Sequence, residues 1–286
     1  MKVSKKYPII AWWSGGITSA VTCKLCLDMY KSCEVRIVFI DTKNEDDDTY
    51  RFLKDCERWY SDAIETITND DYESIQEVWY KYNSLNVAHG AICSSELKRT
   101  VRERFQKVNK FSLQAFGFDI NEMKRVRGME LNYSHINPVF PLIGEGLSKD
   151  DCMRIVTEAG IDPPVTYKYG FRNNNCFKTG CIQGGIGYWQ KMQKEFPDKF
   201  NQMATVEHDL TDRSGRPVTM LKDQAKGGGL VFLKPHLKYP EVIDISQKKG
   251  RPVKPLLECN GFCGINDLSE RSSTEKELNY TQLSIW

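Results

Sequence analysis

The sequence predicts an α/β fold in which a mostly parallel sheet carries helices on both faces. Short β-branched or aromatic runs alternate with amphipathic stretches through the first third of the chain. The 286 residues are 40% hydrophobic and 27% charged, with a net charge of +2. This composition is that of an ordinary globular protein and excludes a disordered chain, a collagenous fibre and a highly basic chromatin-type protein. Ligands of such sheets bind beyond the carboxyl ends of the strands.

The alternation predicts the elements in order. Strands are expected over residues 7–13, 34–41 and 63–68, and helices over 18–30, 46–60 and 72–82. Next come a helix over 94–108, a fourth buried strand over 111–117 and a helix that opens at 121–130. The alternation of short apolar runs with amphipathic stretches ends near residue 140. We therefore expect a nucleotide-binding domain of residues 1–140 and a C-terminal region of residues 141–286.

The C-terminal region is expected to contain two helices and long loops. Ser148 caps a helix that ends before Pro163, and a second helix spans 188–196. The remainder is loop-rich, buries little by itself and is expected to pack against the sheet. No apolar run approaches the ~18 residues of a membrane span, and no signal peptide is recognisable. We therefore expect a cytoplasmic protein.

A glycine turn follows the first predicted strand and opens the first predicted helix. Its sequence is Ser14-Gly15-Gly16-Ile17-Thr18-Ser19. The glycines allow a phosphate to approach the backbone, the hydroxyls supply donors, and the helix N-terminus favours an anion. The alternative is a tight turn with Ser and Thr caps. No G-x-x-x-x-G-K-S/T or G-x-G-x-x-G motif occurs, which argues against P-loop kinases and dinucleotide dehydrogenases.

The glycine turn resembles the Ser-Gly-Gly-x-Asp-Ser loop of PP-loop ATPases and of their relatives, the phosphoadenosine phosphosulfate (PAPS) reductases. Further segments resemble reductase elements at the ends of the next strands: Asp41-Thr42-x5-Asp48-Thr49, Cys93-Ser94-Ser95-Glu96-Leu97-Lys98, and Gly117-Phe118 followed by Arg125. The segment Asn173-Asn174-Asn175-Cys176, with Cys181, Gly184 and Trp189, resembles an element of poorly characterised bacterial and phage members. The resemblance implies a Rossmann-like, adenine nucleotide alpha-hydrolase-like fold with the nucleotide across the strand ends.

The resemblance also implies a set of site residues. Those that would bind the nucleotide are Ser14, Gly15, Gly16, Thr18, Ser19, Asp41, Thr42 and Gly117. Lys98 and Arg125 would act on the phosphate or sulfate as catalytic cations, and the alternative for Lys98 is a solvated basic helix face. Asp41 would accept from a ribose hydroxyl or help to hold a cation, unless it only caps a helix. The acidic residues 45–48 are interpreted as the first turn of that helix.

Thr18 departs from the ATPase pattern, because ATP-cleaving members carry Asp at this position. A threonine hydroxyl is a weaker ligand for Mg²⁺ than a carboxylate. The reductases also lack this Asp. Thr18 therefore favours a nucleotide that already carries a sulfate or another α-substituent.

Ten cysteines are too few for a disulfide scaffold, so reduced thiols are expected. The pairs Cys176-x4-Cys181 and Cys259-x3-Cys263, with Cys93, are candidate ligands of zinc or of a 4Fe–4S cluster, and free thiols are the alternative. Cys259 also resembles the C-terminal thiol of the reductases, so it is either a nucleophile or a ligand. Small buried apolar roles are expected for the remaining five: Cys23, Cys26, Cys33, Cys56 and Cys152.

The predicted function is an enzyme that binds ATP or PAPS and acts at the α-phosphoryl or sulfonucleotide group, in sulfur metabolism or sulfur modification. Mg²⁺ is a further candidate cofactor. One alternative is an ATP-dependent sulfurtransferase that acts on nucleic acid, and another is a nucleotide-sensing module without catalysis. The expected partners are a nucleic acid or a thiol protein that donates sulfur or electrons. No membrane partner is expected, and a homo-oligomer is compatible with the sequence.

Overall fold

A five-stranded sheet organises the N-terminal part of the chain. The structure is a computed structural model, and it describes residues 6–87, 90–174, 176–225 and 228–256. All strands of this sheet run parallel, in the order β3-β2-β1-β6-β7. Their bounds are β1 Ile9–Trp13, β2 Val35–Asp41, β3 Ile64–Thr68, β6 Leu113–Ala115 and β7 Pro138–Val139. The predicted α/β class is confirmed, and the sequence missed β7 because two residues leave no alternation to detect.

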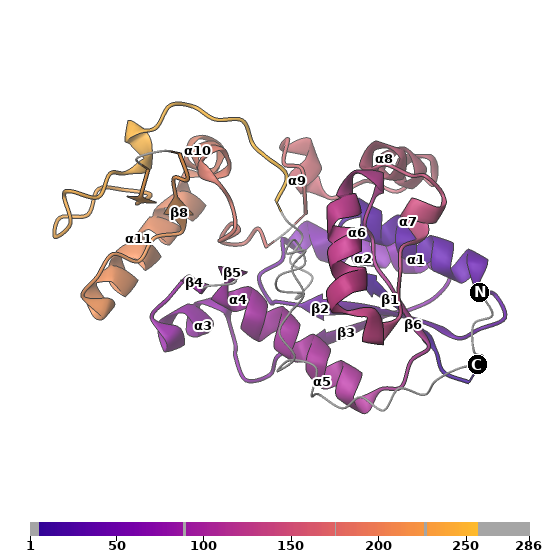
Figure 1. Cartoon of the computed structure of the whole chain (residues 1–286). Coiled ribbons are helices and arrows are strands. Elements are labelled where there is room, and N and C mark those ends of the chain that lie inside the picture. The colour runs from indigo at the N-terminus through magenta and orange to yellow at the C-terminus, as the bar shows by residue number, and fades with distance from the viewer. Residues whose placement is uncertain (1–5, 88–89, 175, 226–227, 257–286) are drawn as a thin grey trace.

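Helices connect and flank the strands (Figure 1). The helices are α1 (Ile17–Met29), α2 (Asp47–Tyr60), α3 (Ile75–Tyr82), α4 (Ile92–Ser94), α5 (Thr100–Val108), α6 (Met123–Asn132), α7 (Pro141–Gly144), α8 (Lys149–Glu158), α9 (Val165–Lys168), α10 (Ile186–Glu195) and α11 (Pro197–Ser214). A π-helical turn, η1 (Ser95–Arg99), joins α4 to α5, and 3-10 turns are η2 (Ile120–Glu122), η3 (Ser134–Ile136) and η4 (Ile245–Gln247). Two small antiparallel pairs are β4 (Asn86–Val87) with β5 (Gly90–Ala91), and β8 (Leu221–Lys222) with β9 (Leu230–Val231).

Both faces of the sheet are covered, as the sequence predicted. Ala11 and Trp13 of β1 pack in a cluster with α1, α2 and α8, whereas the intervening Ile10 and Trp12 pack towards Phe105 of α5. Successive side chains of a strand point to opposite faces, so a strand buried on both sides is apolar at every position. This explains why the first strand was recognisable as a continuous apolar run.

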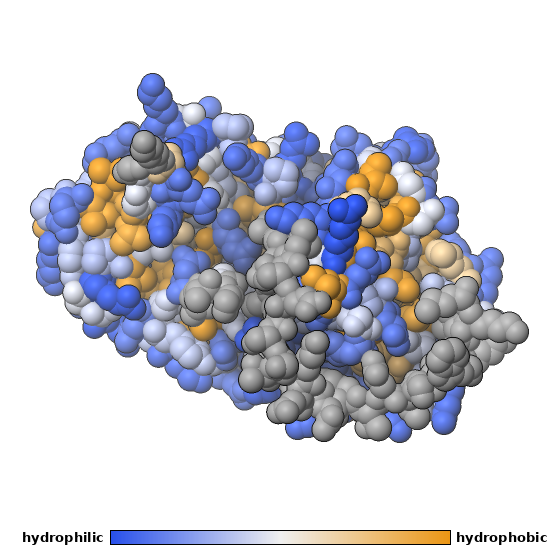
Figure 2. Space-filling view, in the orientation of Figure 1, coloured by the Kyte–Doolittle hydropathy of each residue, from blue (hydrophilic) through white to orange (hydrophobic). Residues whose placement is uncertain are grey.

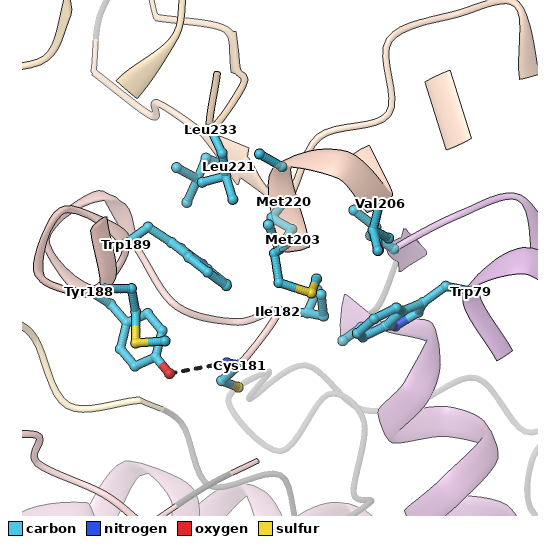
Figure 3. Packing of buried hydrophobic residues seen from close by; sticks show 14 of the residues in the cluster. Trp79, Cys181, Ile182, Tyr188, Trp189, Met203, Val206, Met220, Leu221 and Leu233 are labelled. Carbon is cyan, nitrogen blue, oxygen red and sulfur yellow. Dashed lines mark hydrogen bonds between the residues drawn. The ribbon is translucent and has the colours of Figure 1, made fainter. Parts of the chain in front are cut away.

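The C-terminal region shares a hydrophobic core with α3 (Figure 3). Trp79 of α3, Trp189 of α10 and Met203 of α11 are fully buried in one cluster, which also takes in Leu221 and Leu233. The region therefore packs against the first part of the chain, as the sequence suggested, but against α3 and its neighbours rather than against the sheet. The sequence predicted loops after residue 196, whereas α11 begins there, because Pro197 takes a position in the first helical turn that favours proline.

The carboxyl ends of β1 and β2 lie where the N-terminal sheet meets this C-terminal lobe (Figure 1). Residues 165–181 pass from the side of α8 towards α10 at this position, with α9 next to the start of α1. The contacts between these segments define the candidate site. Among the described residues, no helix is long and apolar enough to cross a membrane.

Candidate functional site

The glycine turn forms a tight loop between β1 and α1. Gly15 has φ +82°, a left-handed conformation that glycine adopts without strain. The Ser14 N–H donates to Ser19 Oγ at 3.0 Å, and the Ser19 hydroxyl donates to the Gly16 carbonyl at 2.8 Å. Ser19 therefore braces the loop from within. Whether Ser14 and Ser19 also contact a nucleotide stays a prediction.

The N-terminus of α1 offers backbone donors. Its cap residue, Gly16, supplies no side chain, and the Ile17 N–H reaches the Tyr167 hydroxyl at 3.4 Å. Within the described part of the chain, the N–H groups of Gly15 and Gly16 donate to no protein acceptor, although both residues are buried. Buried backbone N–H groups are nearly always paired, and at a helix N-terminus they suit an anion. The loop thus has the geometry of an anion site.

Asn174 holds the loop from the C-terminal side. Its side chain is 4% exposed, and Nδ2 donates to the Gly15 carbonyl and to Thr49 Oγ1, both at 2.9 Å. The Thr166 hydroxyl donates to Asn174 Oδ1 at 2.9 Å. All of these partners are buried. The sequence placed Asn174 in a family-like element but gave no sign of this contact, which spans 159 residues.

Gly117 follows β6 and touches the first turn of α1. A Cβ atom at this position would lie 2.8 Å from the Ser19 nitrogen and 3.0 Å from the Thr18 carbonyl carbon. The strand end and the helix can approach this closely because Gly117 has no side chain. Thr18 itself is 2% exposed in the first turn of α1. Both residues thus lie in or against the loop, as the sequence suggested.

The end of β2 carries a second polar turn. Asp41 accepts the Lys43 N–H at 2.8 Å and the Tyr50 hydroxyl at 3.0 Å. Burial, followed by the charge of Asp41, raises the pKa of the Tyr50 hydroxyl. The N-cap of α2 is Asp46 and not Asp41. The Asp41 carboxylate therefore structures the turn that leads from β2 towards α2.

Glu45 is a buried carboxylate beside this turn. It is 1% exposed, and its Oε1 accepts the Thr42 hydroxyl at 2.9 Å and lies 3.9 Å from Lys98 Nζ. Burial raises the pKa of the Glu45 carboxyl, and Lys98 is the largest opposing influence. The expectation that residues 45–48 all belong to the helix turn holds for Asp46 and the next two residues but was wrong for Glu45. The signal available in the sequence was that Asp46 caps α2, which leaves Glu45 outside the helix.

Cys176 joins this buried group from the C-terminal region. Its Sγ lies 3.4 Å from Thr42 Oγ1 and 3.9 Å from Glu45 Oε1. Burial raises the pKa of the Cys176 thiol well above its usual value, and Glu45 is the next cause. Cys181 and Cys93 also raise it, so these three cysteines lie near one another. The sequence predicted that they share a location, and the structure brings them to the site.

The predicted metal centre combines Cys176 and Cys181 with Cys259 or Cys263, and with Cys93 as a further candidate. Cys259 and Cys263 lie outside the described residues. Within the described residues, no group of three or more His, Cys, Asp or Glu side chains is arranged to hold a metal ion. The metal centre therefore stays a prediction.

Most of the other cysteines behave as small apolar residues. Full burial of the side chain is shared by four of them: Cys23, Cys26, Cys56 and Cys152. Burial raises the pKa of Cys26 to about 12 and that of Cys56 to about 12. Thiols with such pKa values react slowly at neutral pH. Cys33 differs from the expectation, because it is only partly buried in a turn beyond α1.

Two predicted cations occupy different surroundings. Lys98, in η1, has a side chain 12% exposed and faces Glu45 at the sheet end. Arg125, in α6, is 5% exposed, stacks on the Phe118 ring with 4.2 Å between the guanidinium carbon and the ring centroid, and pairs with Glu122. Lys98 thus lies in the polar group at the β2 turn. Arg125 lies beside the aromatic segment that follows Gly117.

The segment around Cys176 is tied to the turn after β2 by backbone contacts. The Asn44 carbonyl accepts the N–H groups of Phe177 (3.1 Å) and Lys178 (3.3 Å), and Asn44 Nδ2 donates to Thr179 Oγ1 at 2.8 Å. Residues far apart in sequence thereby enclose the ends of β1 and β2. The geometry describes a buried, polar group of side chains around the ends of these two strands.

Residues 8–116 match the family model described as the phosphoadenosine phosphosulfate reductase domain. This segment is similar to that family. The matching segment contains the glycine loop, the β2 turn and Lys98, whereas Asn174 and Cys176 lie outside it. No curated protein matches the sequence at a significant level.

Several solved structures resemble the chain. The PAPS reductase of Candida auris, in a phosphate complex, is 17% identical, covers 59% of this chain and 81% of its own, and gives a TM-score of 0.45. The NMN synthetase of Francisella tularensis is 14% identical over 55% of this chain and 63% of its own, with a TM-score of 0.36. The U34-tRNA thiolase of Methanococcus maripaludis, with its 4Fe–4S cluster, is 12% identical over 89% and 85%, with a TM-score of 0.36.

Proposed function

We propose that the chain is an enzyme that binds an adenine nucleotide across the ends of β1 and β2 and acts at its sulfonucleotide or α-phosphoryl group. The observation that carries this proposal is the pair of buried N–H groups of Gly15 and Gly16, which donate to no acceptor among the described residues at the start of α1. Phosphate and sulfate oxygens are the acceptors that such a position favours. The family of residues 8–116 supports the same ligand class.

Fixed donors are suited to catalysis as well as to binding. Backbone N–H groups and Lys98 are held before the ligand arrives, so they stabilise charge that develops at phosphorus or sulfur without reorganising. Glu45 keeps Lys98 oriented at 3.9 Å. Arg125, beside Phe118, would supply a second positive charge at the neighbouring strand end. In the proposed enzyme these two cations are the catalytic charges.

A thiol is the proposed reacting group. Cys259 keeps its two proposed roles, nucleophile or metal ligand, and lies outside the described residues. The last described residue, Leu256, donates its N–H to Asn173 Oδ1 at 2.9 Å, next to Asn174. The described chain therefore ends beside Asn174, and the role of Cys259 stays part of the proposal.

Product analysis tests the proposal. The protein is incubated with PAPS and a small thiol, or with ATP and Mg²⁺, and the nucleotides are identified by mass spectrometry. We expect PAPS to yield adenosine 3′,5′-bisphosphate and Lys98→Gln to lose this turnover. Lys178→Gln is the matched control, because the Lys178 ammonium pairs at the surface with Asp47 at 3.7 Å. Binding of both nucleotides without any product would overturn the enzymatic proposal and leave a nucleotide sensor.

A second candidate, an ATP-dependent sulfurtransferase that acts on nucleic acid, is favoured by the charge of the C-terminal lobe. Residues 183–256 contain thirteen Lys and Arg against eight Asp and Glu. Hydrophilic residues cover much of this lobe's face in Figure 2, between smaller apolar patches. A positive excess of this kind attracts a polyanion through its phosphates. Release of AMP and pyrophosphate from ATP at enzymatic rates would favour this candidate over the reductase-like one.

A further inference from the structure

We infer that Asn174 is a positioning residue that orients the Gly15–Gly16 peptide for anion binding. The inference rests on the proposed function, because it concerns the same loop. It adds that the C-terminal region completes the nucleotide site, since Asn174 lies outside the family-matching residues 8–116. Three observations lead to this role: the direction of the hydrogen bonds, the burial of the amide, and the geometry of a trans peptide.

The peptide between Gly15 and Gly16 has one fixed end. Asn174 Nδ2 donates to the Gly15 carbonyl at 2.9 Å. A trans peptide is planar, so its C=O and N–H point in opposite directions. The described peptide bonds include no cis bond. The bond from Asn174 therefore turns the Gly16 N–H away from Asn174, which leaves it directed at the proposed anion.

The Asn174 amide cannot reverse without losing its bond to the Gly15 carbonyl. The Thr166 hydroxyl donates to Oδ1 at 2.9 Å, and Thr49 Oγ1 accepts from Nδ2 at 2.9 Å. The two hydroxyls can donate or accept, but the Gly15 carbonyl can only accept, so a flipped amide would place its oxygen against the carbonyl oxygen. Asn174 is 4% exposed, so the Gly15 carbonyl would lose its partner at a buried position. The orientation of the Gly15–Gly16 peptide is thereby determined by side chains from α2, α9 and residue 174.

Packing restricts the same peptide. A Cβ at Gly15 would lie 2.9 Å from Thr49 Cγ2 and 3.4 Å from Asn174 Nδ2. The loop thus has little room to rotate into an alternative turn while Asn174 is in place. Asn173, the neighbouring residue, has a different task, because its Oδ1 accepts the N–H of Leu256. This difference supplies a matched control at the adjacent position.

The test uses the full-length protein labelled with ¹⁵N-glycine. Wild type is titrated with ATP and with PAPS while the Gly16 amide resonance is followed. We expect a saturable shift of this resonance in wild type. Asn174→Leu should bind about tenfold more weakly. Asn173→Asp should bind with unchanged affinity, because its carboxylate still accepts from the Leu256 N–H. Thr166→Val leaves Asn174 in place but removes the hydroxyl that holds its amide oxygen. We expect this variant to weaken binding by a smaller factor and to displace the Gly16 resonance before ligand is added.

A pH titration of Asn174→Asp separates positioning from simple stabilisation. A carboxylate repels the Gly15 carbonyl, whereas a protonated carboxyl can donate to it. Burial raises the pKa of such a carboxyl into an accessible range. Inorganic sulfate keeps its charge between pH 5 and 8, so it is the probe. We expect its affinity for Asn174→Asp to rise severalfold as the pH falls, with a smaller change in wild type.

The outcomes distinguish the two proposals. Wild type that binds neither nucleotide overturns the proposed function and this inference with it. Wild type that binds, together with folded Asn174→Leu of the same affinity, overturns the inference and leaves the proposed function standing. Should Asn174→Leu fail to fold, Thr166→Val decides, because unchanged affinity and an unmoved Gly16 resonance in that variant contradict the positioning role.

Discussion

Replacing Gly15 by alanine tests the packing of the glycine loop. The substitution acts through two separable effects. The first is backbone strain, because Gly15 has φ +82°. The second is contact, because the added methyl group would lie 2.9 Å from Thr49 Cγ2 and 3.4 Å from Asn174 Nδ2. The structure supplies a control for each effect.

The expected loss of stability follows from these two effects. A non-glycine residue in the left-handed region costs roughly 1–2 kcal/mol. Overpacking a rigid, buried position adds roughly 1–3 kcal/mol. The free energy of unfolding of Gly15→Ala should therefore fall by about 2–5 kcal/mol, which is a large part of the roughly 5–15 kcal/mol typical of a domain. Gly146→Ala shares the positive φ, at +66°, but meets nothing within 4 Å, so the strain alone should appear there.

Urea unfolding of the two variants measures the difference. Thr49→Ser in the Gly15→Ala background removes the clashing methyl group and keeps the oxygen that accepts from Asn174. We expect this second change to restore about the contact part of the loss, as a double-mutant cycle. Equal destabilisation of Gly15→Ala and Gly146→Ala, with no rescue by Thr49→Ser, would show that the loop is not packed as described.

Three further predictions concern titration and chemistry. Glu207 accepts two backbone N–H groups and is fully buried, and burial raises its pKa to about 8, above its value in the unfolded chain. The native state then binds more protons, so the stability that Glu207 confers at low pH should decline by up to about 1.4 kcal/mol per unit between about pH 5 and 8. Glu207→Gln should flatten the profile measured by urea unfolding. Glu45→Gln removes a negative charge beside Cys176, which should lower the pKa of that thiol. We expect alkylation of Cys176 at pH 8, followed by peptide mapping, to become about tenfold faster. Slower alkylation would contradict the assigned contact. Thr18→Asp supplies the carboxylate that Mg²⁺-assisted pyrophosphate release requires, so it should raise weak ATP cleavage, and a wild type that already cleaves ATP rapidly would contradict the reductase-like interpretation.

Local sequence patterns were sufficient to predict much of the N-terminal domain. The run before Ser14 is apolar at each position because both faces of β1 are covered, and its turn residues mark where it ends. The Ser148 cap was recognisable, and its side chain accepts the Asp151 N–H. By contrast, the two residues of β7 carry no periodic signal. The α11 helix begins at Pro197, where one residue type signals both a helix stop and a helix start.

The candidate site was predictable in its loop and unpredictable in its surroundings. The glycine turn contains its own signal, because two glycines between an apolar strand and a helix allow a close approach to the backbone. The contacts of Asn174 with Gly15 and of Cys176 with Glu45 join residues more than 100 positions apart, so they depend on the tertiary fold and leave no local pattern. Glu45 was hidden for another reason, since it stands at the head of an acidic run whose other members belong to α2.

The central claim, that the loop between β1 and α1 binds an adenine nucleotide, is tested most directly by calorimetric titration of wild type and Gly16→Val with ATP and with PAPS. Circular dichroism and the unfolding midpoint confirm first that the variant is folded. We expect wild type to bind at least one of the two nucleotides and Gly16→Val to bind neither, because the valine side chain at the cap of α1 blocks the approach of the phosphate to the N–H groups. A folded Gly16→Val with unchanged affinity would contradict the claim.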